Sequence, residues 1–157
     1  VHQVPEEFNL SREKMLEHVT ELKDMAQPDD LIVIEWVVHR DPDIDRIVSQ
    51  IAEKSDTLIC AGNFGDTIEN WSPATVSEAQ TISCWNKSNQ LAKLSNYGDK
   101  CIPMYGTSVT MSDGTICSGT SASTAIMAGI LWRNTSEKFL RRVMYKMRLY
   151  HEWELQS

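Results

Sequence analysis

The sequence has few basic residues, no paired cysteine motif and no long apolar run, and each scarcity excludes a class of protein. Its 15 Lys and Arg residues stand against 22 Asp and Glu residues, which gives a formal net charge of −7. Because phosphate binding needs a basic surface, nucleic acid is not expected as a partner. No Cys-x-x-Cys pair is present, so a zinc site has no support.

The longest apolar run excludes a membrane span. It covers residues 31–34 and resumes after Glu35 at 36–38, which is too short and too interrupted to cross a bilayer. No stretch at the N-terminus reads as basic, then apolar, then small, so no signal peptide is visible. Since the chain starts at Val1 rather than Met, we expect it to be a processed or excised piece.

Four cysteines permit two disulfides in any of three pairings, or else they are buried thiols that act as small hydrophobic residues. The cysteines are Cys60, Cys84, Cys101 and Cys117. Four Asn-x-Ser/Thr triplets favour a secretory route and glycosylation. The triplets begin at Asn9, Asn70, Asn86 and Asn134. We predict a secreted or extracellular glycoprotein with disulfides, and keep a cytoplasmic protein as the alternative.

The first half of the chain predicts a βαβ unit. Residues 10–26 place apolar side chains at helical spacing, and Pro28 ends this helix. The apolar residues 31–38 lack polar alternation, which favours a strand covered on both faces, as in a parallel sheet. An amphipathic helix over 44–52 and a strand over 57–61 follow, and the crossover between the two strands is expected to be right-handed.

The second half is expected to be rich in loops before it ends in two helices. Short extended pieces are predicted near 79–86, 91–95 and 100–104. A helix of small residues is predicted over 121–131 and an amphipathic helix over 136–150. With 157 residues, 41% of them hydrophobic, the chain suits one compact domain, or a portion of one, over 1–157. The predicted fold class is α/β, with a mostly parallel sheet flanked by helices.

The segment around Ser121 is the strongest candidate for chemistry. A Gly119-Thr120-Ser121 turn leads into a helix with no charged residue before Arg133, so this helix is expected to be buried. Its first turn directs unpaired main-chain N–H groups, and the positive end of the helix dipole, at Ser121. Such groups suit a serine that attacks a carbonyl, because they can hold the oxyanion that forms. Alternatively, Ser and Thr are here as ordinary helix caps.

Asn63 is the second candidate, because it follows the predicted strand over 57–61. In open α/β sheets, binding sites form at the carboxyl ends of the strands. Gly62 and Gly65 flank a tight turn from which the amide of Asn63 can project toward such a site. Alternatively, Asn63 is an asparagine that tolerates left-handed geometry in a turn.

Together these elements resemble the subtilisin-like serine proteases. The runs 61–63 and 119–121, followed by Ala128-Gly129 in the helix, carry the likeness. The segments 88–98 and 100–106, and the strand and helix before Asn63, follow the family's order. The resemblance extends over about residues 29–131, and it implies the C-terminal half of a subtilisin-like catalytic domain.

The resemblance implies roles for individual residues. Ser121 would be the nucleophile of a serine endopeptidase that acts through an acyl-enzyme, and the Asn63 side chain would help to form the oxyanion hole. Residues next to these groups, or at the end of the substrate-edge strand, would bind the substrate. They are Val37, Val38, His39, Gly62, Gly119 and Thr120. No cofactor is expected, and a structural calcium ion is left open.

The sequence also departs from the family. Ala125 stands where the family usually has Pro, four residues after the nucleophile, and Ile126 follows where the family often has His. Val37-Val38-His39 stand where the edge strand usually ends in Ser-Leu-Gly, so the usual specificity pockets are altered. The family's Asp and its His motif lie upstream of the edge strand, and residues 1–30 contain neither.

A serine without a base is a poor nucleophile, so this chain alone is expected to be close to inert. The favoured hypothesis is a serine endopeptidase whose Asp and His come from a missing N-terminal fragment or a partner chain. His39 is a less favoured replacement base, or else a polar histidine in a turn. The alternatives are a protease-like module that binds a peptide or protein partner without cleaving it, and an unrelated α/β binding domain.

Overall fold

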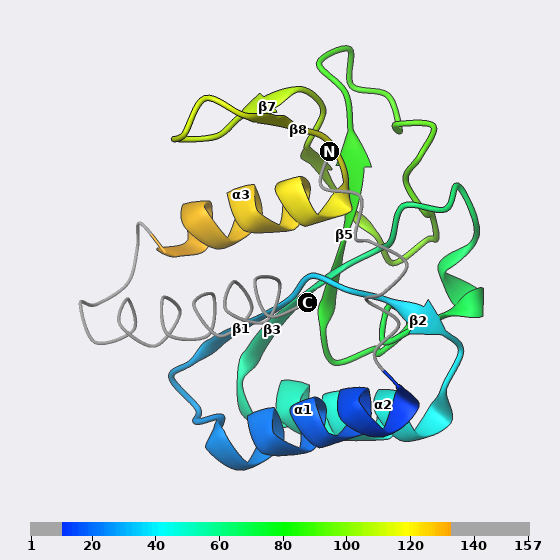
Figure 1. Cartoon of the computed structure of the whole chain (residues 1–157), viewed down its shortest axis with the longest axis vertical. Helices are drawn as coiled ribbons and strands as arrows, with labels where there is room; N and C mark the ends of the chain where they lie inside the picture. The colour runs from blue at the N-terminus through cyan, green and yellow to red at the C-terminus, as the bar shows by residue number, and fades with distance from the viewer. Residues whose placement is uncertain (1–10, 133–157) are drawn as a thin grey trace.

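The computed structural model describes residues 11–132, which form three layers with a parallel sheet between helices (Figure 1). The four strands lie in the order β1-β3-β5-β6, and each neighbouring pair is parallel. Their bounds are Leu31–Ile34 for β1, Asp56–Cys60 for β3, Gln80–Trp85 for β5 and Ile102–Tyr105 for β6. The predicted α/β fold is confirmed. The helix expected over 136–150 and the sequons at Asn9 and Asn134 lie outside the described residues.

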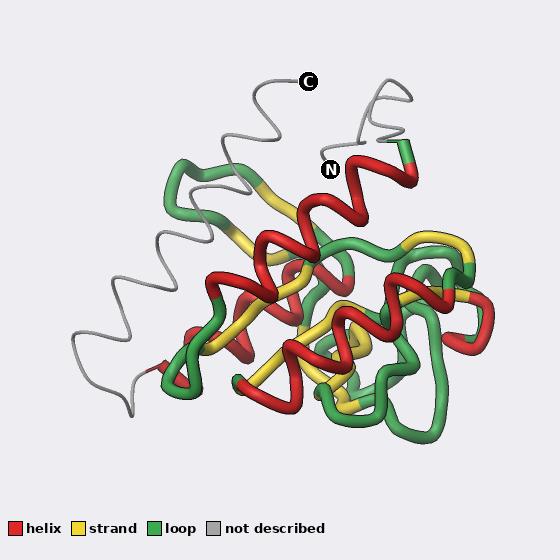
Figure 2. Tube along the Cα trace, turned by 90° about the horizontal axis from the view of Figure 1, so that it is seen from below, coloured by secondary structure: helices red, strands yellow, loops and turns green. Residues whose placement is uncertain are grey.

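Helices α1 and α2 lie side by side on one face of the sheet (Figure 2). α1 spans Arg12–Met25 and α2 spans Pro42–Lys54. The α2 side chains pack against Ile32 and Ile34, because alternate residues of a strand point to opposite faces. Both helices of the predicted first half are therefore present, within two residues of the expected bounds.

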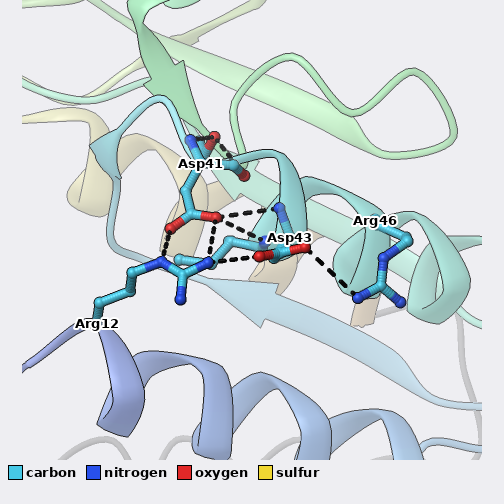
Figure 3. Close-up of polar contacts among 6 residues, drawn as sticks. Arg12, Asp41, Asp43 and Arg46 are labelled. Carbon is cyan, nitrogen blue, oxygen red and sulfur yellow. Dashed lines mark hydrogen bonds and ion pairs between the residues drawn. The ribbon is translucent and has the colours of Figure 1, made fainter.

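The N-terminus of α2 is tied to α1 by charged side chains (Figure 3). The Asp41 carboxylate caps α2, since its Oδ1 accepts the N–H groups of Asp43 and Ile44 at 3.0 and 3.4 Å. Arg12 of α1 donates to the same carboxylate through Nε at 2.7 Å and also pairs with Asp43. These contacts link the start of the crossover helix to α1.

Helix α3, Thr120–Trp132, covers the opposite face. Leu31, Leu58 and Ile82 of three successive strands pack against its Ala128. Since β1 gives Leu31 to this face and Ile32 to the other, its lack of polar alternation is explained. No described helix is long and apolar enough to span a membrane.

The expectation that α3 is buried on all sides is wrong for the described residues. Ile130 is 47% exposed and Leu131 is 38% exposed, although the helix contains no charged side chain. The sheet contacts only one side of the helix, so the other side presents apolar groups to the surface. A helix that is apolar all round is normally enclosed, which makes this outward side of α3 an unusual surface.

The apolar run over 31–38 forms two strands rather than the one predicted. β1 stops at Ile34, and β2, Val38–His39, pairs antiparallel with β4, Trp71–Ser72. Glu35 interrupts the run where the chain leaves the carboxyl edge of the sheet. The pairing partner of β2 is more than 30 residues away, so local pattern gives no sign of the break.

The strand predicted over 91–95 is also wrong. Leu91 alone among these residues pairs with a strand, through a bridge to Trp85. The Asn86 side chain accepts the N–H groups of Ser88 and Gln90 at 2.9 and 3.1 Å, which closes a turn before Leu91. The chain then continues in turns that prepare the residues described below.

All four cysteines lie in the described part of the chain and all are free thiols, so the disulfide prediction is wrong. Cys60 and Cys84 are buried in β3 and β5, as the alternative interpretation expects. Cys117 belongs to the antiparallel pair of β7, Val109–Thr110, and β8, Ile116–Cys117. Its Sγ contacts Met111 Sδ at 3.4 Å.

Candidate active site

The loop after β3 and the first turn of α3 meet at the carboxyl edge of the sheet. Asn63 Oδ1 accepts two hydrogen bonds from Thr120, from the main-chain N–H at 2.8 Å and from the hydroxyl at 2.9 Å. The Thr120 hydroxyl itself accepts the N–H of Gly62 at 3.1 Å. Thr120 is fully buried, so leaving its two donors without an acceptor would be costly.

This arrangement fixes which way the Asn63 amide faces. The Thr120 N–H is a donor, and the Thr120 hydroxyl must also donate because its oxygen already accepts from Gly62. Both donors require the amide oxygen, so the Nδ2 group faces away from Thr120. Among residues 11–132, Nδ2 has no hydrogen-bond acceptor. Two N–H donors of an exposed residue are therefore left for an acceptor from outside the described residues.

Gly119 allows the amide to approach α3. Its φ is +144°, a conformation that side-chain-bearing residues rarely adopt, and a Cβ there would lie 3.1 Å from Asn63 Nδ2. The Gly119 N–H donates to the oxygen of Gly106 at 2.9 Å, and a Cβ on Gly106 would overlap Ser123 Oγ. The glycines around the helix start are therefore required by close packing.

Ser121 follows Thr120 in the first turn of α3 and is partly exposed. Its Oγ donates to the main-chain oxygen of Glu35 at 3.4 Å, which is long for a hydroxyl donor, so the hydroxyl is weakly held. Its own N–H lies in the first helical turn, which has no acceptor within the helix. This N–H and Asn63 Nδ2 are the donors available to a negative charge that develops beside Ser121.

The other small residues of α3 have structural contacts. The Ser123 hydroxyl donates to the main-chain oxygen of Met104 at 3.0 Å, and the Thr124 hydroxyl donates to that of Thr120 at 2.6 Å. Both bonds satisfy buried hydroxyls, and the bond to Met104 links the helix to β6. Ser121 differs from its neighbours because its hydroxyl is neither fully buried nor firmly bonded.

The predicted substrate-edge residues divide between two places, and Val37 belongs to the first. Val37 Cγ2 lies 2.8 Å from the position that a Cβ on Gly62 would take, so it packs directly on the loop that carries Asn63. Glu35, two residues earlier, brings its main-chain oxygen to Ser121. The segment 35–37 therefore borders the site on the side of β1.

Val38 and His39 lie in β2, beyond this border. They pair with β4, and the His39 ring stacks on Trp71 with ring centroids 4.7 Å apart. In the described part of the chain, His39 makes no hydrogen bond to Ser121. The geometry therefore gives no support to His39 as a replacement base.

Cys60, the last residue of β3, is a second nucleophilic group close to Thr120. Burial, together with the nearby charge of Glu35, raises the pKa of its thiol to about 12. A neutral thiol is a poor nucleophile, because the thiolate is the reactive form. Of the two groups, the Ser121 hydroxyl is therefore the better candidate for a nucleophile.

Two participants were not predicted, namely the main-chain oxygen of Glu35 and the side chain of Asn96, which bonds the loop around Asn63. A main-chain contact leaves no mark in a sequence, and Asn96 was seen only as part of the run 88–98. Over residues 11–132, no three His, Cys, Asp or Glu side chains gather as metal ligands would.

The sequence pattern of the subtilase family matches residues 36–147, which is more than half of the chain. The chain belongs to the subtilase family. Its fold is similar to that of a cold adapted subtilisin-like serine proteinase, with a TM-score of 0.66 and 22% identity over 76% of this chain and 47% of that one. The prenylagaramide maturation protease PagA gives a TM-score of 0.60 and 18% identity over 77% and 48%. No curated protein matches this chain in sequence.

This subtilase chain spans about half the length of these two similar structures. Family membership implies a serine peptidase lineage. Within the described residues, five predicted site residues form one cluster and Val37 adjoins it. The five are Gly62, Asn63, Gly119, Thr120 and Ser121.

Proposed function

We propose that this subtilase chain carries the nucleophile and the oxyanion-binding amide of a serine endopeptidase, whose Asp and His come from a partner chain or a missing N-terminal fragment. One observation carries the proposal. Thr120 engages Asn63 Oδ1 twice, which leaves Nδ2 as a fixed donor next to the helix turn of Ser121. Fixed donors of this kind stabilise a developing oxyanion without reorganisation.

The chemistry follows from these positions. Ser121 Oγ attacks the carbonyl carbon of a peptide bond and gives its proton to the base. The carbonyl oxygen becomes an oxyanion, which accepts hydrogen bonds from Asn63 Nδ2 and the Ser121 N–H. The protonated base then gives its proton to the amine as the C–N bond breaks, leaving an acyl-serine that water hydrolyses by the same steps.

The outward side of α3 and the free edge of β1 are surfaces on which a partner polypeptide could pack, and they favour the proposed partner. The exposed Ile130 and Leu131 form an apolar surface on α3, the helix whose first turn contains Ser121. β1 is an edge strand of the sheet, so one side of its backbone has no strand partner among the described residues. Exposed apolar faces and free sheet edges are surfaces on which other chains pack.

The test is to treat the native assembly, with any co-purifying chain, with a fluorophosphonate that reacts with activated serines. We expect an adduct on Ser121, located by peptide mass spectrometry, and no adduct in Ser121→Ala. If Ser121 stays unlabelled with the partner chain present, the protease proposal is wrong.

The second candidate is a module that binds a peptide or protein without cleaving it. Val37 favours it, because this side chain packs on Gly62 and adds bulk to the border of the site. Under this candidate, peptide binding measured by calorimetry would be equal in the wild type and Ser121→Ala, and no fluorophosphonate adduct would form. Labelling of Ser121 would exclude it.

A further inference from the structure

A single buried side chain bonds both sides of the loop that carries Asn63. Asn96 is fully buried, and its Nδ2 donates to the oxygen of Ala61 at 2.9 Å. Its Oδ1 accepts the N–H groups of Phe64 at 2.9 Å and Asp66 at 3.1 Å.

The backbone of Asn96 adds a fourth bond, because its N–H donates to the oxygen of Gly62 at 2.8 Å. The four bonds therefore reach two residues before Asn63 and two after it. Asn63 itself makes no bond to Asn96, and its own side chain is held by Thr120. The loop is thus clamped from one side by Asn96, while the amide that it presents is clamped from the other side by α3.

Gly62 shows how closely the clamp fits. Its φ is +102°, and a Cβ at this position would overlap Asn96 Nδ2. The main chain can therefore approach the Asn96 amide only because residue 62 has no side chain. The hydrogen bonds of Asn96 to this loop therefore require glycine at position 62.

The bonds also explain why this residue is Asn. The site needs a donor toward Ala61 and an acceptor toward two N–H groups, and a planar amide supplies both. A carboxylate in its place would accept from Phe64 and Asp66 but would set an oxygen against the oxygen of Ala61. An apolar side chain would leave three main-chain groups without these partners, and for the oxygen of the buried Ala61 this is costly.

We propose that Asn96 is a positioning residue of the active site, which acts by holding the loop 61–66 so that the Asn63 amide meets Thr120. It touches neither Ser121 nor a substrate carbonyl, so its effect passes through Asn63. The effect on reaction rate rests on the proposed peptidase function, whereas the effect on the Asn63–Thr120 contact does not.

The contact is tested by hydrogen exchange at the Thr120 N–H, which bonds Asn63 Oδ1. In Asn96→Ser we expect this N–H to exchange on the order of tenfold faster than in the wild type, although it lies in a different element. Asn96→Asp keeps the acceptor and is expected to exchange at an intermediate rate. Unchanged exchange at Thr120 in a folded Asn96→Ser protein would overturn the proposal.

Asn86→Ala is the matched control, because Asn86 also accepts two main-chain N–H groups, those of Ser88 and Gln90, in a different turn. We expect it to leave exchange at Thr120 unchanged. If it accelerates exchange as much as Asn96→Ser, the effect is a general loss of stability and the proposal is overturned. If Asn96→Ser does not fold, Asn96→Asp carries the comparison.

The rate effect is tested by a double-mutant cycle on fluorophosphonate labelling of Ser121. We expect Asn96→Ser to slow labelling by about 10-fold to 100-fold in the wild-type background and by less than about twofold in the Asn63→Ala background. Equal slowing in both backgrounds would contradict action through Asn63. If the wild type is not labelled while exchange at Thr120 depends on Asn96, the peptidase function fails and the positioning role stands.

Discussion

Asn63 and Thr120 lie 57 residues apart in the sequence, yet one oxygen of Asn63 accepts both hydrogen-bond donors of Thr120. The first turn of α3 therefore orients an amide that belongs to the loop after β3. If the amide turned over, it would face these donors with its own N–H groups and leave buried groups unpaired, at a cost of about 1–3 kcal/mol. The fold itself thus sets the direction of the Nδ2 donors.

The Thr120 hydroxyl is the first test of this relationship. Thr120→Val keeps the side-chain shape and the main-chain bond to Asn63 but removes the acceptor of the Gly62 N–H. We expect the free energy of unfolding to fall by about 1–3 kcal/mol, since a buried donor loses its partner. Ser121 labelling is expected to slow, but by less than in Asn63→Ala. Denaturant unfolding and labelling kinetics measure both effects, and Thr120→Ser is expected to restore them.

Gly119 is the second test, with Gly114 as its control. Both have positive φ, +144° and +84°, but a Cβ on Gly119 would press on Asn63 while one on Gly114 meets nothing within 4 Å. We expect Gly114→Ala to cost about 1 kcal/mol of stability from backbone strain, with the Ser121 labelling rate unchanged. Gly119→Ala is expected to cost more and to slow labelling strongly. Equal labelling rates in the two variants would show that Gly119 matters only to its own backbone.

The link between α1 and α2 predicts a loss of stability in acid. The Arg12 guanidinium, hydrogen-bonded to Asp41, lowers the pKa of that carboxyl (Figure 3). A lowered pKa stabilises the fold at pH values above the unfolded pKa, near 3.9, and this contribution is lost as the pH falls through the folded value. We therefore expect Arg12→Ala to lower Tm at pH 7, and the difference from wild type to shrink below about pH 4. A difference that is constant down to pH 2 would contradict this account.

Asp45 predicts the opposite dependence. Burial raises the pKa of its carboxyl, and this effect outweighs the opposing influence of the Ser72 hydroxyl and of Arg40, whose Nε lies 3.1 Å from Oδ2. A raised pKa gives stability that is present below the unfolded pKa and is lost as the pH rises through the folded value. Asp45→Asn, which stays neutral, is expected to raise Tm at pH 7 and to match wild type more closely near pH 4. Thermal unfolding across this range decides, and a lower Tm at pH 7 would contradict the prediction.

The fold could be predicted because its sheet and helices follow from local apolar patterns. Ile44, Ile47 and Ile51 repeat at helical spacing, and all three are buried in the structure. The break at Glu35 could not be predicted, since it depends on the pairing of Val38–His39 with a distant strand. The exposed side of α3 could not be predicted either, because the sequence of a helix does not show which of its sides the rest of the fold covers.

The candidate site could be predicted in part. Asn63 and Ser121 stand in short motifs beside glycines, and the structure brings their neighbourhoods together. The two hydrogen bonds from Thr120 to Asn63 and the four hydrogen bonds of Asn96 depend on side-chain directions that only the folded chain defines. Asn96 follows turn residues, where an asparagine indicates a surface turn as readily as a buried amide.

The rate of fluorophosphonate labelling of Ser121 in the native assembly, compared between wild type and Asn63→Ala, tests the account most directly. We expect the wild type to be labelled at Ser121 and Asn63→Ala to react about 10²–10³-fold more slowly while it stays folded, the loss that follows removal of one oxyanion donor. Equal rates in the two proteins, or no label on Ser121 in either, would contradict it.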